Sequence, residues 1–410
     1  MKARNLRHYI DIALRDTPVV LVNGARQTGK TTLVKEVAAK RKAAYVTLDD
    51  HGSLDAALND PSGFIADLGP FAVIDEVQNA PNIFRAIKAS VDRDRRPGRF
   101  LLTGSANVLV LPKLGDSLAG RMEIVTLHPM AQDELAGRKS TFIDTVFGRA
   151  LPRTPLGHCD RTKLARKVFV GGYPEVMGRA ESARRNAWFK AYVTGILQRD
   201  VRDISNISDL TAMPKLLAQL ALRSSGLMNL ADIGRGIDTP HTTLRRYLAL
   251  LEATFLHVPL KPWTASRSNR LVKAEKIHLS DCGFAAHLCG IHSAIDLGKS
   301  DRFGNLLETF VVGELRKMSG WSKVPVEAYH FRNEKAREVD VVLEDIAGRV
   351  VGIEVKASSS IGSDDLIGLK QLRDTAGKKW VRGIVLHSGP DITGFNKDLH
   401  AVPMSALWEW

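Results

Sequence analysis

The motif GARQTGKT at residues 24–31 constrains the fold of this chain more than any other feature. It follows an apolar run at residues 18–23 and precedes a helical stretch at residues 32–40. Glycines in such a motif let backbone N–H groups surround phosphates at a helix N-terminus, while the lysine reaches the β- and γ-phosphates and the threonine hydroxyl binds Mg²⁺. A chance glycine turn would lack this strand and helix context. The nucleotide-binding residues predicted here are Gly24, Ala25, Arg26, Gln27, Thr28, Gly29, Lys30, Thr31 and Thr32, with Thr31 also a metal ligand.

A second motif, FAVIDEVQ at residues 71–78, predicts a buried strand that ends in two acids. Open parallel sheets bind ligands at the carboxyl ends of their strands. We therefore expect Asp75 to hold Mg²⁺ and Glu76 to orient and polarise an attacking water. A solvated strand end is the alternative for two adjacent carboxylates, and the phosphate-binding motif upstream argues against it.

Two further sites are candidates for a role in hydrolysis. In FLLTGSAN at residues 100–107, the hydroxyl of Ser105 or Thr103 is placed to contact the γ-phosphate or the water, although a simple strand-to-turn junction explains either hydroxyl equally well. Arg121 follows a glycine in LAGRM and is a candidate arginine finger, which would neutralise transition-state charge on a neighbouring subunit's nucleotide. An ordinary surface arginine is the alternative.

The first third of the chain alternates short apolar runs with helical stretches. Continuous apolar strands separated by helices predict an α/β fold with a parallel sheet covered on both faces. The 410 residues exceed the usual size of a single core, so we expect further domains. The five runs lie at residues 18–23, 44–48, 71–75, 100–104 and 123–127.

Composition excludes several classes of protein. With 44% hydrophobic and 25% charged residues, the chain is typical of a folded protein, not of a disordered or collagen-like one. Its apolar runs are too short to cross a bilayer and its N-terminus lacks a signal-peptide pattern, so we expect a cytoplasmic protein without membrane contact. Cys159, Cys282 and Cys289 lack metal-site spacing and are expected to be reduced. The net charge of +13 modestly favours a polyanionic partner such as nucleic acid.

Residues 227–253 are typical of two helices joined by a tight turn, and strand-like runs at 256–263 and 273–280 follow. This order predicts a winged helix-turn-helix. Packing against protein is the alternative to DNA binding, and we favour DNA because basic residues accumulate in the expected wing. Trp263 is expected in a core or domain interface rather than stacked on a base. The residues expected to face DNA are Thr242, Thr243, Arg245 and Arg246. The basic residues assigned to the wing are Lys261, Arg267, Arg270, Lys273 and Lys276.

Two alternating strands near the C-terminus carry a further set of charged residues. Asp340 lies in VDVVL, and Glu354 and Lys356 share one face of the next strand, GIEVKA. Carboxylates so placed hold Mg²⁺, and the lysine helps to generate or orient hydroxide for phosphodiester cleavage. The pattern resembles the PD-(D/E)xK nuclease superfamily, in which Glu308 fits the accessory acid and Gln371 is a further candidate. A retained fold with a lost reaction is the alternative.

Eight segments, in order, carry a wider resemblance. They are GARQTGKTTL, VIDEVQ, LLTGSAN, SLAGR, LHPM with Glu134, FVGGYPEV, YLALLEATFLHVPL and KIHLSDCGFAAHL. Together they resemble bacterial and archaeal AAA+ ATPases whose C-terminal half is a domain long catalogued as of unknown function. The resemblance covers nearly the whole chain and implies an ATPase that uses ATP and Mg²⁺ and assembles as a homo-oligomeric ring, for example a hexamer. Ala25 stands where this family usually has proline.

We therefore expect four domains and two alternative functions. The domains are an AAA+ P-loop ATPase domain at residues 1–135, a helical lid or connector at 136–209, a winged helix-turn-helix at 210–299 and a nuclease-like domain at 300–410. The leading function is ATP-driven binding and processing of branched or otherwise structured DNA, with metal-dependent nuclease activity as an open part of it. The alternative is a nucleotide-dependent regulatory switch that binds protein partners and carries an inactive nuclease-like domain.

Overall fold

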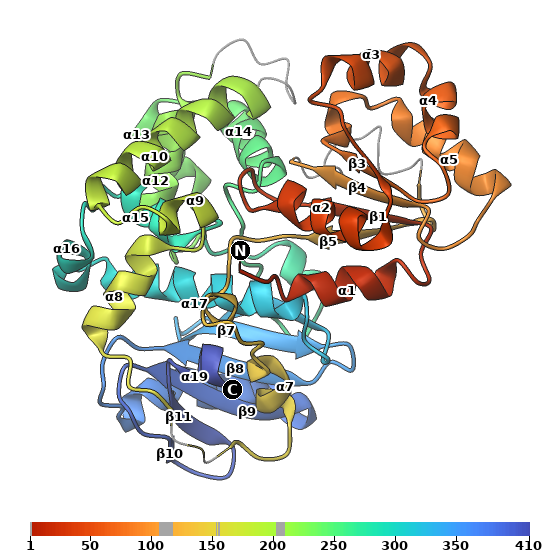
Figure 1. The fold of residues 1–410 in the computed structure, drawn as a ribbon. Helices are drawn as coiled ribbons and strands as arrows, with labels where there is room; N and C mark the ends of the chain where they lie inside the picture. Colours follow the sequence, from red (N-terminus) through yellow and green to blue (C-terminus); the bar gives the residue numbers. More distant parts are fainter. Residues whose placement is uncertain (1, 106–117, 153, 155, 202–209) are drawn as a thin grey trace.

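The computed structural model describes residues 2–105, 118–152, 154, 156–201 and 210–410 (Figure 1). They form an N-terminal sheet with its helices, a helical region beside it, and a C-terminal sheet (Figure 1). No described helix is long and apolar enough to cross a bilayer. Ala106, Asn107 and Ser117, which belong to two of the motifs above, lie outside the described residues, as does the expected domain boundary at residue 209.

The N-terminal sheet has five strands in the order β2-β3-β4-β1-β5, and every adjacent pair is parallel. The expected parallel α/β sheet is thereby confirmed. All five residues of β1 are buried because β4 and β5 flank this strand and helices cover both faces. The strands are β1 (Val19–Asn23), β2 (Ala44–Thr47), β3 (Ala72–Asp75), β4 (Phe100–Gly104) and β5 (Met122–Thr126).

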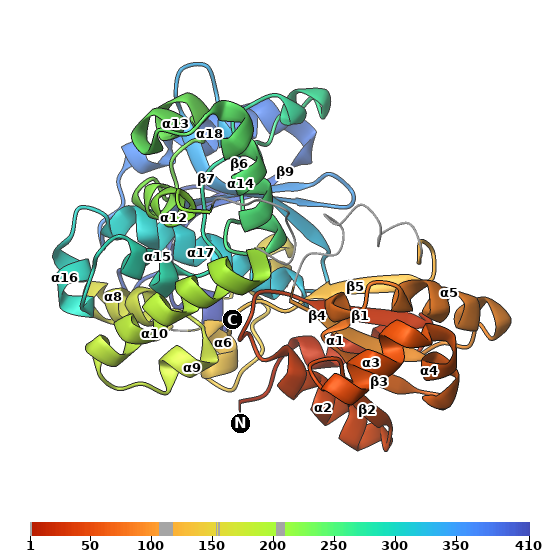
Figure 2. The ribbon, with the colours of Figure 1, turned by 90° about the horizontal axis from the view of Figure 1, so that it is seen from above.

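Helices cover the two faces of this sheet with separate cores. Alternate residues of β1 point to opposite faces, so Leu21 packs in one core with Ile87, while Val20 packs in the other with Val34. Figure 2 shows this unit lying to one side of the helical region. Its helices are α1 (Leu6–Ala13), α2 (Lys30–Arg41), α3 (His51–Asn59), α4 (Pro61–Asp67) and α5 (Ile83–Arg93).

The rest of the chain is built around one large hydrophobic core, whose members run from Ala131 to Trp408, and a smaller one on the other face of the C-terminal sheet. The division of this part into three domains stays a prediction. The helices before the last sheet are α6 (Gln132–Leu135), α7 (Phe142–Phe147), α8 (Arg161–Val170), α9 (Pro174–Met177), α10 (Ser182–Gly195), α12 (Met213–Leu222), α13 (Leu230–Ile237), α14 (His241–Ala253), α15 (Cys282–Leu288), α16 (Ala294–Lys299) and α17 (Phe303–Ser319); a π-helical turn (Ile196–Asp200) extends α10.

Helices α12, α13 and α14 precede a reduced wing. The two expected strands pair only at isolated antiparallel bridges, Leu260 with Lys276 and His257 with Leu279. Pro259 and Pro262 lack the N–H group that a longer ladder would need. Trp263, which is 1% exposed, lies in the core as expected.

The C-terminal sheet is mixed, with the order β10-β11-β9-β8-β7-β6. Strands β8, β9 and β11 are parallel, and the other pairs are antiparallel. Helix α17 packs on the face that carries Val341 and Leu343, and α18 packs on the face that carries Val342. The strands are β6 (Val326–Arg332), β7 (Glu338–Asp345), β8 (Val350–Val355), β9 (Trp380–His387), β10 (Thr393–Gly394) and β11 (Leu399–Pro403), and the helices are α18 (Ile367–Ala376) and α19 (Ala406–Glu409).

Candidate functional site

The loop between β1 and α2 is shaped by two glycines with positive φ. Gly24 has φ +141°, and a Cβ there would lie 2.2 Å from the Leu127 carbonyl oxygen, so a side chain cannot be accommodated. Gly29 has φ +95° and leads directly into α2. The buried Lys30 ammonium lies inside the loop, where it donates to the carbonyl oxygens of Gly24 (2.8 Å) and Ala25 (3.0 Å). The loop thus places a lysine and a helix N-terminus at one point, which is the chemistry of a phosphate site.

The two acids after β3 are held by hydroxyls from neighbouring strands. Asp75 accepts hydrogen bonds from the Tyr45 hydroxyl, at 2.7 Å, and from Thr103. Burial and the adjacent Asp75 raise the pKa of Tyr45, so this hydroxyl stays a donor. The backbone N–H of Glu76 donates to Thr103 Oγ1 at 3.0 Å, which links β3 to β4 at this point.

Glu76 has a strained backbone. Its φ of 59° lies in the left-handed region, which residues other than glycine and asparagine rarely adopt. Gln78 donates to the Glu76 carboxylate and, at 3.1 Å, to Ser105 Oγ. Strain of this kind persists where the surroundings hold it, and it occurs often at functional sites. Here Thr103, Gln78 and Ser105 supply that support.

Predicted nucleotide residues gather at one edge of the N-terminal sheet. Residues 24–32 follow β1, Asp75 and Glu76 end and follow β3, and Ser105 follows β4. Since these strands are parallel, their carboxyl ends meet at this edge.

Arg121 lies at the opposite edge. It immediately precedes β5, its carbonyl oxygen accepts from the Val19 N–H at 3.2 Å, and its guanidinium pairs with Asp92 at 2.5 Å. Because β1 and β5 are parallel, the residue before β5 is one strand length away from the loop after β1. Arg121 therefore cannot reach a nucleotide bound by its own subunit.

Two residues that sequence reasoning missed support the glycine loop. Arg4 donates to the carbonyl oxygens of Thr28 (2.8 Å) and His128 (2.6 Å), and it pairs with Glu134 at 3.1 Å. The Tyr192 hydroxyl of α10 donates to the Arg26 carbonyl oxygen at 3.2 Å, which ties the helical region to this loop. Neither contact has a local sequence signal; of the residues involved, only Glu134, four residues after the LHPM segment, stood out.

The exposed face of α14 carries the residues expected to contact DNA. Thr242, Arg245 and Arg246 are exposed and Thr243 is half-buried, while Leu244 lies on the opposite, buried face. This is the arrangement of an amphipathic helix with a free polar surface.

In the C-terminal domain, the structure brings the four predicted charged residues together. Burial and the nearby Asp340 raise the pKa of Glu308, and the same two causes raise the pKa of Glu354 to about 8. Lys356 Nζ lies 3.1 Å from Glu354 Oε1, and the other Glu354 oxygen is buried without a hydrogen-bond partner. Gln371 is apart from this group: it is exposed and accepts from Asn333 at 3.4 Å.

Lys276 lies inside this carboxylate cluster, and its assignment to a basic wing was wrong. The side chain is 1% exposed, and its ammonium contacts Glu308 at 2.8 Å, Asp340 at 3.2 Å, and Glu338. Burial alone would lower the pKa of Lys276, but the three carboxylates raise it overall, so the lysine is a buried cation. Arg270 was misassigned as well, because its side chain is only 9% exposed and pairs with Glu344 at 2.5 Å.

The carboxylate cluster in this arrangement does not fit a divalent metal. One Asp340 oxygen contacts the Lys276 ammonium and the other accepts the Val355 N–H at 2.9 Å. No group of three or more histidine, cysteine, aspartate or glutamate side chains within the described ranges is arranged to hold a metal ion. The cation among these carboxylates is the ammonium of Lys276.

Three family models match the chain. They are an AAA domain at residues 16–136, a domain of unknown function (DUF8612) at 161–294 and a domain of unknown function (DUF4143) at 303–407. Together with the parallel sheet and its glycine loop, they define an AAA-type protein of the P-loop ATPase fold with a DUF4143 domain at its C-terminal end.

Relatives extend over most of the chain. The uncharacterized protein Rv2008c of Mycobacterium tuberculosis is 30% identical over 349 residues, which cover 85% of this chain and 72% of that protein; the uncharacterized protein Mb2031c of Mycobacterium bovis gives the same values. An uncharacterized protein of Haemophilus influenzae is 23% identical over 286 residues, 66% of this chain and 64% of that protein. The chain belongs to the family of the two mycobacterial proteins.

Solved structures show more distant likenesses. The Walker-type ATPase PABY2304 of Pyrococcus abyssi has 14% identity and a TM-score of 0.44, with 69% of this chain and 94% of that chain covered. The RuvB Holliday junction branch migration motor of Thermotoga maritima has 15% identity and a TM-score of 0.30, with 62% and 88% covered. No function is inferred from either likeness.

Proposed function

We propose that this protein hydrolyses ATP and uses the cycle to bind and process structured DNA. The observation that carries the proposal is the single sheet edge at which the glycine loop, Lys30, Asp75 and Glu76 meet. This edge combines cationic and N–H groups for phosphates with a carboxylate for magnesium and a second carboxylate for water. Nucleotide storage would need the first set but not the strained, supported Glu76.

Each residue at this edge has a chemical task. Lys30 offsets charge on the β- and γ-phosphates, and Thr31 and Asp75 supply the oxygen ligands that Mg²⁺ prefers. Bound there, Mg²⁺ would neutralise charge that develops on the transferred phosphoryl group. Glu76, held by Gln78, orients the attacking water, and Ser105 keeps Gln78 in place. Arg121 completes the site of a neighbouring subunit, because it faces away from its own.

The DNA part of the proposal rests on α14. Its exposed Thr242, Arg245 and Arg246 face away from the core on the helix that follows the turn, where recognition helices carry their contacts. The reduced wing, with Lys276 buried and Arg270 paired with Glu344, offers less positive surface than the sequence suggested. Phosphate contact is therefore concentrated on α14.

The test is ATP hydrolysis by the full chain, with and without junction, forked, single-stranded and duplex DNA. We expect hydrolysis that DNA stimulates, with the branched substrates most effective. Lys30→Ala should abolish hydrolysis and leave DNA binding intact, whereas replacing Arg245 and Arg246 with alanine should remove stimulation and leave basal hydrolysis. An ATPase that no DNA binds or stimulates would contradict the DNA part alone.

One observation favours a second candidate, a nucleotide-dependent switch whose nuclease-like domain is inactive. Lys276 stands where a cleavage site would need a divalent cation, and both Asp340 oxygens already have partners within the protein. Incubating the full chain with the same DNA substrates and Mg²⁺ or Mn²⁺ separates the two. Absence of cleavage together with DNA-independent hydrolysis would favour the switch.

A further inference from the structure

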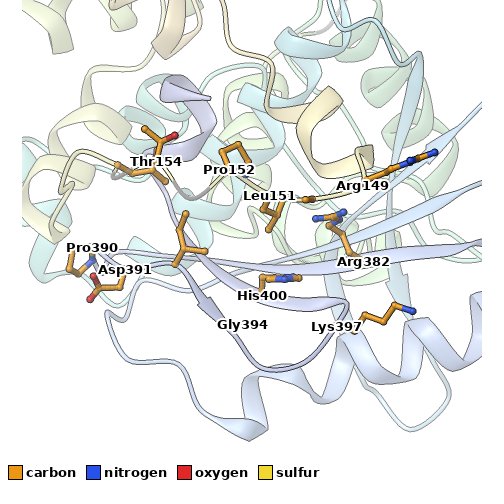
Figure 3. A pocket seen from close by; sticks show the side chains of 13 residues that line it. Arg149, Leu151, Pro152, Thr154, Arg382, Pro390, Asp391, Gly394, Lys397 and His400 are labelled. Atoms are coloured by element: carbon orange, nitrogen blue, oxygen red, sulfur yellow. The ribbon is translucent and has the colours of Figure 1, made fainter.

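A cavity of about 840 Å³ lies on the side of the C-terminal sheet formed by β9, β10 and β11 (Figure 3). Leu151 and Pro152, which follow α7, form its upper wall, and strand residues form its floor (Figure 3). It belongs to neither the nucleotide edge nor the carboxylate cluster, since it shares no lining residue with them. Its volume is that of a small-molecule pocket.

Arg382, in β9, is the central polar residue of this cavity. It is 6% exposed, and one guanidinium nitrogen donates to the Gly148 carbonyl oxygen at 2.5 Å. Its Nε is buried without any hydrogen-bond partner, and no acid among the described residues pairs with it. Burial lowers its pKa and no carboxylate opposes that effect. A buried charge is costly unless it is paired, so this guanidinium lacks an anion.

Neighbouring side chains add a neutral histidine and two cations on the same side. His400 in β11 lies directly opposite Ile384 in β9. Because Ile384 is two residues from Arg382, the side chains of His400 and Arg382 lie on the same face of the sheet. The His400 Nδ1 is also buried without a partner, and burial and Arg382 lower the pKa of this ring. The exposed Arg149 and Lys397 stand at the rim near Arg382 (Figure 3).

Acidic groups around the cavity do not neutralise this end. Asp391 lines the opposite end, beside Pro390 (Figure 3). Asp398, next to Lys397 in the chain, is engaged elsewhere: it accepts from Trp380 Nε1 at 2.7 Å and lies 3.8 Å from Arg373. The Arg382 end of the cavity therefore carries three cationic side chains, those of Arg382, Arg149 and Lys397, and two buried nitrogens without hydrogen-bond partners.

We propose that this cavity binds a terminal phosphate group, with Arg382 as its main contact. Guanidinium groups bind phosphate through parallel N–H bonds, and a histidine beside them adds a further donor. A recessed arginine is within reach of a terminal phosphate, whereas an internal phosphodiester carries a nucleotide on each side that the cavity walls would obstruct. The phosphate belongs either to a free nucleotide or to the phosphorylated end of a nucleic-acid strand.

The experiment uses the full chain with Lys30→Ala, so that the glycine loop does not contribute phosphate binding. Inorganic phosphate, a nucleoside 5′-monophosphate and a single-stranded oligonucleotide with or without a 5′-phosphate are titrated by calorimetry. We expect phosphate to bind, and either the monophosphate or the phosphorylated oligonucleotide to bind more tightly; which of the two does so identifies the source. Adding Arg382→Met should weaken this binding at least tenfold. Lys378→Ala, at an exposed lysine outside the cavity, is the matched control.

Thermal melting is a second test if the calorimetric signals are small. It compares the Lys30→Ala protein, the parent here, with the same protein carrying Arg382→Met, first in phosphate-free buffer and then with added phosphate. Removing an unpaired buried charge should leave the melting temperature of Arg382→Met equal or higher, and phosphate should then stabilise only the parent. Equal stabilisation of both proteins by phosphate would overturn the proposal. So would a monophosphate that binds no more tightly than inorganic phosphate, if oligonucleotides with and without the 5′-phosphate also bind equally. His400→Ala should show the same loss in smaller degree.

Discussion

Lys276 Nζ lies 3.2 Å from Asp340 Oδ1, although the two residues come from the wing and from β7, 64 positions apart in the chain. The same ammonium contacts Glu308 and Glu338. Three carboxylates therefore share one buried lysine, and the segment after α14 is fixed to the C-terminal sheet through it. The position of the wing and the neutralisation of the three carboxylates thus depend on the same side chain.

Lys276→Met should destabilise the protein and create a cation site. Removing one partner of a buried ionic cluster costs about 3–5 kcal/mol, because the remaining charges are left unpaired. With a chelator present, we expect the variant to melt at a lower temperature than the parent. Mn²⁺ or Mg²⁺ should recover part of this loss in the variant and should not raise the melting temperature of the parent. The exposed Lys273→Met is the matched control and should change neither value.

Asp340→Asn in the Lys276→Met background should remove the metal-dependent increment by deleting a ligand charge. Metal-dependent DNA cleavage that appears with Lys276→Met and is lost on adding Lys356→Ala would show that the reaction is intact but blocked by the lysine. Equal stabilisation of the parent by metal would contradict this, since the site would then accept a divalent ion without displacing Lys276.

The parts of the site that were predicted from sequence are local ones. Residues 24–32 and Asp75 occupy their positions because a strand, a turn and a helix follow one another in the chain, and parallel pairing brings strand ends together. Lys276 was misassigned because it stands three residues after Lys273, in a basic stretch. Its partners are fixed only when α17 and β7 pack beside it. The contacts of Arg4 and Tyr192 with the glycine loop are likewise tertiary, with no periodic signal.

Lys30→Ala and Glu76→Gln should separate binding from hydrolysis. Lys30→Ala removes phosphate charge compensation, so tight ATP binding should be lost. Glu76→Gln keeps the size of the side chain but not its charge, so ATP should bind and hydrolysis should slow by about 10²–10⁴-fold, the usual contribution of a general base. Equilibrium binding and single-turnover hydrolysis measure the two effects. Parent-like turnover by Glu76→Gln would refute its assigned role.

Arg121 should act on the nucleotide of a neighbouring subunit, because it lies at the sheet edge opposite its own loop. Arg121→Ala alone should reduce hydrolysis by about 10³-fold or more, as is found for arginine fingers. Mixing Arg121→Ala with Lys30→Ala subunits should partly restore hydrolysis. At some interfaces the Arg121→Ala subunit then supplies an intact glycine loop, and the Lys30→Ala subunit supplies the arginine. No recovery in assemblies shown by mass to be mixed would count against the finger.

The α14 arginines should contribute electrostatically to DNA binding. The slope of log affinity against log salt is negative. Replacing both Arg245 and Arg246 with alanine should make it shallower by about 2, because each phosphate contact contributes about 0.9 to its magnitude. Fluorescence anisotropy over a salt series measures the slope. Arg15→Ala, an exposed arginine of the N-terminal domain, is the control and should leave the slope unchanged. An unchanged slope in the double variant would place DNA elsewhere.

Glu252, near the end of α14, should make stability depend on pH. Burial, then the adjacent Glu275, raises the pKa of Glu252 to about 7, against about 4.3 in an unfolded chain. The folded protein thus retains a proton that the unfolded chain releases, so the free energy of unfolding should fall as pH rises from about 4.5 to 7. Glutamine mimics the protonated acid, so Glu252→Gln should match the parent at pH 4 and melt at a higher temperature at pH 8. Glu275→Gln should produce part of the same gain, because it lowers the pKa of Glu252, and the exposed Glu334→Gln should produce none. A gain of equal size at pH 4 and pH 8 would mean that the substitution acts through packing instead of through this proton.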